Sequence, residues 1–417
     1  MPTSATVLRF EPKSPVSDGW HRGLPELTGA GFRLREPRLS DAERLARALG
    51  PDDAATLGVE APGGSDQWMQ FVAKVRANRG DGHAACYLLE ADGTTDACGL
   101  ILLERLTPRS RVTMASCVLA ASLWPTGLPA QGLEAAFAFA FDTVGVGRVE
   151  GRTASDRLLE VVCELGAVRE GVLRGALPLG GGFSDQVLWS VLSTEWAGQD
   201  RREAPAATPG PAATPAAEEA PEDDGERAPA WTRQLPVLKG SQLTLREVEL
   251  LDASVLLNVL DPADLEISIE PAPRTRDDLR RYIAWAQLQR SLGRAAGFAI
   301  VPRGTRHAAG LIQVRRTDPA GVVAEWGIVL AARHRGTGAA AEATRLLAGF
   351  AFDTIGVHRL EARASGIDPR SIGLMRKMGA VREARLRRSF ARGSEVLDED
   401  LWAILKSDWR RDVTAAN

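Results

Sequence analysis

The chain has 417 residues, which is too long for one typical hydrophobic core and predicts two or three domains. Its 51 basic and 54 acidic residues give a formal net charge of -3, so charge does not favour a general role in binding nucleic acid or membrane surfaces. The amino-terminal segment MPTSATVLRFEPKSP lacks the apolar core of a signal peptide, and no segment approaches the roughly 18 apolar residues of a membrane-spanning helix. We therefore expect a cytoplasmic protein.

The cysteine and histidine patterns argue against a metal centre. The four cysteines form no CxxC pair, and the five histidines form no HExxH motif. We therefore expect no metal site and no disulfide framework. Buried free thiols are expected at Cys86, Cys98, Cys117 and Cys163.

Two halves of the chain repeat each other. FRLREPRLSDA, starting at Phe32, matches LTLREVELLDA, starting at Leu243, at an offset of 243 minus 32, or 211. FDTVGVGRVE at Phe141 matches FDTIGVHRLE at Phe352 at the same offset, and the later segment GAVRE matches at 379 minus 166, or 213. The repeat predicts two domains of one fold.

The repeats are separated by a segment of different composition. Residues 198–230 are rich in alanine, proline and charge and contain almost no large apolar side chains. Such a segment cannot bury enough surface to offset its ordering entropy, so we expect an extended linker. The predicted organisation is an extension over 1–29, a first domain over 30–197, this linker, and a second domain over 231–417.

Periodicity within the second repeat predicts a mixed α/β unit. In chain order we expect a strand near 245–248, helices from Asp252 to about Leu292, strands at 298–302, 309–316 and 323–330, a loop and helix, a strand at 358–364, a short helix at 369–378, and strands at 381–390 and 398–405. Gly356 and Gly379 are expected to end the two later helices.

The loop RHRGTG, from Arg333 to Gly338, has the composition of a phosphate cradle. The first amides of a helix lack intrahelical partners and carry the positive end of the helix dipole, so an open loop before them can bind a pyrophosphate. Gly336 and Gly338 allow positive φ and close approach of a ligand. The alternative is an ordinary turn from a loop into a helix.

Five ordered segments resemble the GNAT acetyltransferase superfamily, notably its branch that acetylates protein N-terminal amines, including those of ribosomal proteins. They are AEWGIVL, RHRGTG, FDTIGVHRLEAR, DPRSIGLMRKMGAVREARLR and DEDLWAILKSDW. The resemblance covers nearly all of 241–410 and, more weakly, 30–197. It implies two tandem domains, each a splayed mixed β-sheet flanked by helices. It also implies direct transfer of an acetyl group from acetyl-CoA to a primary amine, either a protein or peptide N-terminus or a small molecule.

The resemblance also implies a set of site residues. Cofactor contacts are expected at Val329, Leu330, Arg333, His334, Arg335, Gly336, Thr337, Gly338, Ala339, Asp368 and Arg376. Glu325 is the expected general base, acting through water with a pKa raised by partial burial, and the alternative is an exposed strand carboxylate. Ser371 is the expected partner of the CoA thiolate, or else a residue that starts a helix beside Pro369. Asp368 stands where the family has asparagine and therefore lacks an amide donor.

The acceptor should enter over the early helices and the last hairpin. Glu266 and Glu270 could attract a cationic amine, or could be solvated loop charges. Tyr282, the only tyrosine in this half, is expected to pack in the core or the acceptor cleft rather than to act as a general acid.

The first repeat lacks these functional residues. Glu325 aligns with Met114, Arg333 with Ser122, Arg335 with Trp124, Gly336 with Pro125 and Ser371 with Leu158, whereas Gly338 is kept as Gly127. Proline offers no N–H and excludes positive φ, so we expect a half that folds without catalysing. It could pack on the second half as an intramolecular pseudo-dimer in a monomeric chain, or help form the acceptor site. A non-catalytic acyl-CoA-binding scaffold and a transferase with a longer acyl donor are the alternative functions.

Overall fold

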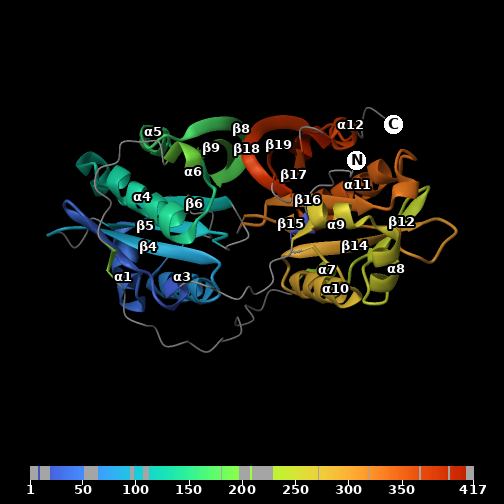
Figure 1. Ribbon diagram of the computed structural model, residues 1–417, viewed down its shortest axis with the longest axis horizontal. Helices are drawn as coiled ribbons and strands as arrows, with labels where there is room; N and C mark the ends of the chain where they lie inside the picture. The colour runs from blue at the N-terminus through green and yellow to red at the C-terminus, as the bar shows by residue number, and fades with distance from the viewer. Residues whose placement is uncertain are drawn as a thin grey trace. The chain divides into compact units, whose positions relative to one another are not determined.

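A computed structural model describes residues 8–9, 19–50, 64–93, 98–106, 112–179, 181–196, 207–208, 229–270, 272–318, 320–365, 368–392 and 395–409. The chain forms two compact units (Figure 1). The N-terminal unit comprises residues 13–220, and the C-terminal unit comprises residues 221–417 together with residues 1–12. Most of the predicted linker lies outside the described residues.

The N-terminal unit contains one strand-rich layer with helices around it. Its elements, with η marking 3-10 or π turns, are η1 (Gly19–Arg22), β2 (Glu26–Gly29), β3 (Phe32–Arg35), η2 (Leu39–Asp41), α1 (Ala42–Ala48), α3 (Ser65–Gly80), β4 (Ala84–Ala91), β5 (Cys98–Glu104), β6 (Val112–Leu119), η3 (Ala121–Thr126), α4 (Leu128–Ala138), η4 (Phe139–Val144), β7 (Arg148–Thr153), α5 (Asp156–Glu164), β8 (Val168–Leu179), β9 (Gly182–Leu192), α6 (Ser193–Trp196) and β10 (Ala207–Thr208).

The C-terminal unit repeats this order of elements. They are β1 (Leu8–Arg9), α7 (Ala230–Arg233), β11 (Leu238–Lys239), β12 (Leu243–Glu247), α8 (Asp252–Val259), α9 (Pro262–Ser268), β13 (Ile269–Glu270), α10 (Arg276–Ser291), β14 (Ala295–Pro302), β15 (Gly310–Arg316), β16 (Val323–Leu330), η5 (Ala332–His334), α11 (Ala339–Phe350), η6 (Ala351–Ile355), β17 (Arg359–Ser365), α12 (Pro369–Lys377), β18 (Val381–Arg392) and β19 (Glu395–Leu405). The predicted strand at 323–330 is observed with the same bounds, and the other predicted helices and strands lie close to their expected positions.

Each unit is built on a mixed sheet. In the main sheet of the C-terminal unit the strands follow the order β12, β14, β15, β16, β17, β19, β18, and among these seven strands only the pair β16 and β17 is parallel. The N-terminal unit has the same arrangement in β3, β4, β5, β6, β7, β9 and β8. The predicted mixed α/β fold in two copies is therefore confirmed.

The parallel pair separates partway along its length. β16 and β17 pair only from Val323 with Arg359 to Glu325 with Glu361. Beyond that point β16 continues along β15 as far as Leu330, while β17 continues along β19. The sheet therefore splits in two after Glu325. β6 and β7 of the N-terminal unit split in the same way after Met114 pairs with Glu150.

Helices cover both faces of the sheet in the C-terminal unit. Because side chains alternate along a strand, Trp326 and Ile328 of β16 pack in the core that contains Leu347 of α11. Val329 packs in the opposite core with Ile283 of α10. Figure 1 shows α10 and α11 on opposite sides of this sheet. Side chains at Glu325 and Val329 therefore share the α10 face.

The glycine predictions agree with the structure, and the prediction of buried cysteines holds for three of the four. Gly356 and Gly379 adopt positive φ where α11 with its π turn η6, and then α12, come to an end. Cys86, Cys98 and Cys117 are buried free thiols and Cys163 is a half-buried one. The π turn between α11 and Gly356 was not predicted, because its hydrogen-bond pattern has no distinct side-chain signature.

Candidate active site

The loop after β16 has the backbone geometry predicted for a phosphate cradle. Gly336 and Gly338 have φ of 76° and 92°, both in the left-handed region. Gly338 is the N-cap of α11, so the first helix amides follow it directly. A Cβ at Gly336 would meet no heavy atom within 4 Å, so it is the positive φ rather than crowding that favours glycine there.

Thr337 organises the loop from within. Its Oγ1 donates to the carbonyl oxygen of His334 at 2.8 Å and accepts from the amide of Ala339 at 3.3 Å. Thr126 makes the same two contacts in the N-terminal unit, with Leu123 at 2.6 Å and Leu128 at 3.2 Å. The threonine therefore maintains the turn in both copies.

A cavity of about 690 Å³ opens beside this loop. It collects residues from the end of β16, the loop, the first turn of α11 and one side of α12. Its lining includes the predicted residues Val329, Leu330, Arg335, Gly336, Gly338, Asp368 and Ser371. The end of β16 with its loop and α12, which are about 30 residues apart in the chain, thus both line this cavity.

Other predicted contacts lie outside the lining of the cavity, and several lining residues were not predicted. Predicted but not lining are Tyr282, Glu325, Arg333, His334, Thr337, Ala339 and Arg376; lining but not predicted are Asp264, Ile328, Ala332, Ala340, Ala341, Arg370, Gly373, Leu374 and Lys377. On α12 the helical period already distinguishes them, since positions 370, 373, 374 and 377 share one face and position 376 does not.

The positive charge of the loop is smaller than its sequence suggests. Partial burial and the charge of Arg333 lower the pKa of His334, which accepts a hydrogen bond from Arg333 Nε at 3.1 Å. The guanidinium of Arg335 is ion-paired with Asp264 of α9, whose side chain is 1% exposed. Arg335 Nε also donates to the carbonyl oxygen of Leu330 at 3.3 Å. The pairing with Asp264 joins positions 71 residues apart, which local patterns do not reveal.

The start of α12 has the contacts of a capped helix. Asp368 accepts from the amides of Arg370 at 3.2 Å and Ser371 at 3.3 Å, and Pro369 occupies the first turn. The hydroxyl of Ser371 donates to Asp368 Oδ2 at 2.8 Å. A serine has a single donor hydrogen, so bonding a thiolate would require Ser371 to release Asp368.

Glu325 lies at the closed end of the split between β16 and β17. It is buried, with 6% exposure, so the alternative of an exposed carboxylate is wrong. Arg315 Nη2 contacts Glu325 Oε2 at 3.0 Å, and Arg363 Nε lies 3.9 Å from Oε1. Both guanidinium groups favour the ionised carboxylate and so oppose the effect of burial.

A row of polar side chains leads along the α10 face towards Glu325. Tyr282 Oη donates to Gln313 Oε1 at 2.9 Å, and burial raises the pKa of Tyr282. Gln313 and Arg315 alternate onto the same face of β15. Tyr282 packs in the core, as expected. The side chains of Glu266 and Glu270 lie outside the described part of the structure.

The N-terminal unit has apolar residues at several positions of this row and of the cradle. Phe71 and Leu102 stand at the positions of Tyr282 and Gln313 and are buried. Trp124 packs against the apolar core at the position of Arg335, and Pro125 lies inside η3. The corresponding loop thus keeps its turn but loses donors.

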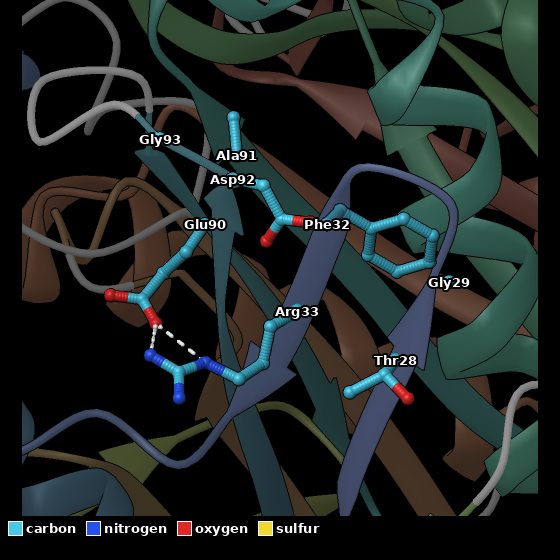
Figure 2. Close-up of a pocket in the computed structure, with 8 residues that line it drawn as sticks. All are labelled: Thr28, Gly29, Phe32, Arg33, Glu90, Ala91, Asp92 and Gly93. Carbon is cyan, nitrogen blue, oxygen red and sulfur yellow. Dashed lines mark hydrogen bonds and ion pairs between the residues drawn. The ribbon is translucent and has the colours of Figure 1, made fainter.

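A cavity of about 470 Å³ in the N-terminal unit lies elsewhere, between the β2–β3 hairpin and the end of β4 (Figure 2). Its lining residues are Thr28, Gly29, Phe32, Arg33, Glu90, Ala91, Asp92 and Gly93. Arg33 donates twice to Glu90 beside it, at 2.9 and 3.2 Å. None of these residues aligns with the cradle, so this cavity is not its counterpart.

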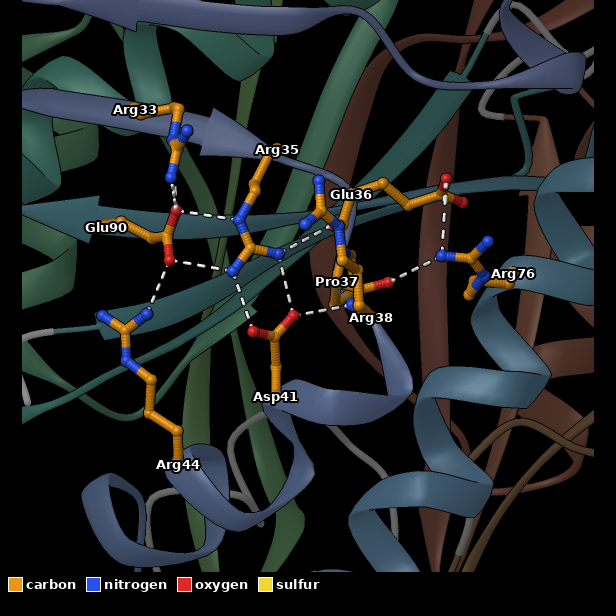
Figure 3. A network of polar contacts seen from close by, with 9 residues as sticks. All are labelled: Arg33, Arg35, Glu36, Pro37, Arg38, Asp41, Arg44, Arg76 and Glu90. Atoms are coloured by element: carbon orange, nitrogen blue, oxygen red, sulfur yellow. Dashed lines mark hydrogen bonds and ion pairs between the residues drawn. The ribbon is translucent and has the colours of Figure 1, made fainter. Parts of the chain in front are cut away.

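Glu90 belongs to a polar network that is specific to the N-terminal unit (Figure 3). Arg35 joins Glu90 to Asp41, with contacts of 2.8 Å to each carboxylate, and Arg44 contacts Glu90 at 2.6 Å. The pair of Arg35 and Asp41 recurs in the C-terminal unit, but Glu90 aligns with Val301 there.

A sheet that splits between two parallel strands, with a glycine-rich loop at the start of the following helix, defines an α/β protein whose open helix N-terminus is suited to an anionic ligand. A family model described as an acetyltransferase (GNAT) domain matches residues 32–157 and 242–381. The chain belongs to the GNAT acetyltransferase family and carries its domain twice. It is therefore an acyltransferase that uses acetyl-CoA.

Individual relatives correspond to less than half of the chain. An uncharacterized N-acetyltransferase p20 from Bacillus licheniformis is 27% identical over 176 residues, which cover 42% of this chain and 99% of that protein. A GNAT-family acetyltransferase from Bacillus anthracis is 22% identical with a TM-score of 0.37, over 41% of this chain and 99% of that one. RimL, described as a ribosomal L7/L12 alpha-N-protein acetyltransferase in complex with coenzyme A, is 14% identical with a TM-score of 0.38, over 42% and 99%.

Among the described residues, no helix is long and apolar enough to cross a membrane. Within the same ranges, no group of three or more His, Cys, Asp and Glu side chains is arranged to hold a metal ion.

Proposed function

We propose that the C-terminal unit contains the single active site and transfers an acetyl group from acetyl-CoA to a primary amine. The acceptor would be a protein or peptide N-terminus, or an amine-bearing small molecule. One observation carries the proposal: the cavity beside the cradle is lined by Ile328, Val329 and Leu330, the part of β16 that lies beyond its last pairing with β17 at Glu325. We further propose that the N-terminal unit is a pseudo-enzyme, which its Met114, Pro125 and Leu158 support.

In this proposal each group of the site has a physical task. Acetyl-CoA supplies the activated acetyl thioester, and the amides after Gly338 hold its pyrophosphate. Glu325, which is paired with Arg315, accepts the proton of the arriving ammonium through water. Ser371 would donate to the thiolate after leaving Asp368.

The number of cofactor sites tests the assignment of the two units. Titration calorimetry of the whole chain with acetyl-CoA is expected to give one site, because only one unit keeps the cradle. Two equal sites would contradict the pseudo-enzyme proposal. CoA binding without thiol release from any amine in a broad panel would instead favour a non-catalytic binding protein.

The role of Glu325 is tested by Glu325→Gln, which keeps the shape but removes the base. We expect kcat to fall about 100-fold while the Kd of acetyl-CoA stays unchanged, as measured by thiol release and calorimetry. Met114→Gln, at the aligned position of the N-terminal unit, is the matched control and should leave kcat unchanged. An unaltered pH–rate profile in Glu325→Gln would reject the role of general base.

A further inference from the structure

The polar network around Glu90 in the N-terminal unit has an excess of positive charge (Figure 3). Arg76 joins the network by donating to the carbonyl oxygen of Pro37 at 3.1 Å, and Arg79 joins it by contacting Glu36 at 2.5 Å. The charged members are then Arg33, Arg35, Glu36, Arg38, Asp41, Arg44, Arg76, Arg79 and Glu90. Six arginines and three carboxylates leave a formal surplus of three positive charges.

The carboxylates of this network are more buried than its cations. Glu90 and Asp41 are buried, whereas the side chain of Arg33 is 47% exposed and Arg38 is exposed. Within the ranges that the structure describes, the guanidinium of Arg38 forms no ion pair, and Nε and Nη2 of Arg44 donate no hydrogen bond. The surface formed by Arg33, Arg38, Arg44 and Arg76 is called the basic face.

The same positions of the C-terminal unit lack the surplus. At the offset of 211, the charged residues there are two arginines, Arg246 and Arg290, and three carboxylates, Glu247, Glu249 and Asp252. The four positions of the basic face become Thr244, Glu249, Val255 and Gln287. The two units share one fold, so the fold does not require the surplus. An exposed basic surface is suited to a polyanionic partner.

The chain itself contains an anionic segment that begins near this face. Residues 218–226 hold six acidic side chains and no basic one: Glu218, Glu219, Glu222, Asp223, Asp224 and Glu226. This acidic segment lies outside the described residues. Ten residues before it, β10 pairs antiparallel with β2, Ala207 with Leu27 and Thr208 with Glu26. The start of the linker is therefore attached to the N-terminal unit.

The direction of β10 leads the chain towards the basic face. β2 is antiparallel to β3 as well as to β10, so β10 and β3 run in the same direction. The chain therefore leaves Thr208 towards the end of β3 that precedes Arg38, two strand spacings or about 10 Å away. The nine residues between Thr208 and Glu218 can span about 30 Å. The acidic segment is thus within reach of the basic face.

We propose that the acidic segment, residues 218–226, binds in cis to the basic face of the N-terminal unit. Its carboxylates complement the exposed arginines through charge-assisted hydrogen bonds. Attachment to the same chain gives the segment a high effective concentration at the face. The linker is then anchored to the N-terminal unit over part of its length. This inference does not depend on the proposed acetyl transfer or on the cofactor site.

Binding of a fluorescent peptide in trans tests the proposal on the full chain. The peptide spans residues 214–228, and its partner is a linker-neutral chain in which the six acidic residues of the segment are replaced by glutamine or asparagine. Fluorescence anisotropy is expected to show at least about tenfold tighter binding to this chain than to wild type, because the tethered segment occupies the face in wild type. The affinity should fall as salt rises, since the arginines are exposed.

Variants of the linker-neutral chain locate the binding surface. Arg38→Gln/Arg76→Gln should weaken peptide binding at least about tenfold. Arg38→Gln alone leaves the ion pairs of the network intact, and it should weaken binding about threefold in a chain with unchanged thermal unfolding. Arg157→Gln, which removes an exposed cation of α5 outside the face, is the matched control and should stay within about twofold.

Three results would overturn the inference. They are equal peptide affinity in wild type and the linker-neutral chain, equal affinity in the basic-face variants and the Arg157→Gln control, and equal binding of a peptide whose six acidic residues are neutralised.

Discussion

Arg388 has a left-handed backbone conformation, and the equivalent residue of the N-terminal unit is a glycine. Its φ is 50°, and Gly175, 213 residues earlier, has φ 55°. Both lie where the last hairpin shifts register, and both amides donate to an aspartate, Asp398 at 3.0 Å and Asp185 at 2.8 Å. The C-terminal unit therefore carries strain that the N-terminal unit avoids.

Replacing Arg388 by glycine should stabilise the protein, and replacing Gly175 by arginine should destabilise it. Arg388→Gly is expected to raise the free energy of unfolding by about 0.5–1 kcal/mol, because the left-handed backbone costs glycine little. Gly175→Arg should lower it by a similar amount. Urea unfolding measures both. A loss of stability in Arg388→Gly would mean that side-chain contacts outweigh the strain.

At the scale of elements, the loops before α4 and α11 have the same turn but differ at one position, which is proline in the N-terminal unit and glycine in the C-terminal unit. Pro125 is accommodated in the N-terminal copy, and Gly336 occupies the same place with positive φ in the other. The turn made by the threonine is common to both. The loops therefore differ in their donors more than in their ability to fold.

Gly336→Pro should convert the cradle into the N-terminal form. We expect acetyl-CoA binding to weaken at least about tenfold, because proline removes an N–H and positive φ. Thermal unfolding should show a folded protein with a modest loss of stability. Gly349→Ala in α11 is a control that should leave binding intact, because a Cβ there would meet no heavy atom within 4 Å. Unchanged affinity in Gly336→Pro would reject the loop as the pyrophosphate site.

The sequence predicted the elements and the positive φ of Gly336 and Gly338, but not the contacts made by the side chains around the loop. β16 and the loop Arg333–Gly338 were predictable because apolar runs and glycine positions are local signals. The partners of Glu325 and Arg335 were not, because Arg315 reaches Glu325 only through the register of β15 on β16. Asp264 comes from a different helix. Ser371 was assigned from family resemblance, whereas its bond to Asp368 follows from helix capping.

At the scale of the whole molecule, two copies of one fold differ in how charge is buried. In the N-terminal unit, burial alone would raise the pKa of Glu90, but hydrogen bonds and charge from Arg35 hold it below its usual range. The same balance, with Arg35 as partner, lowers the pKa of Asp41. The C-terminal unit has Val301 at the position of Glu90.

The N-terminal unit should therefore lose stability in acid. A carboxylate with a depressed folded pKa stabilises the fold above its unfolded pKa of about 4, and this contribution disappears as pH falls through the folded value. Glu90→Gln should destabilise the unit at pH 7, and its difference from wild type should shrink towards pH 3. Urea unfolding at several pH values measures this. A difference that is constant across pH would contradict the role of the ionised network.

The π turns η4 and η6 occupy equivalent places in the two units, each followed by a glycine with positive φ. A π turn is a rare insertion into a helix, so independent origin in both copies is a poor explanation. The common ancestor of the two halves carried it before the gene segment was duplicated. The differences at Pro125, Met114 and Leu158 distinguish the copies and therefore arose after duplication, on a scaffold that both units keep.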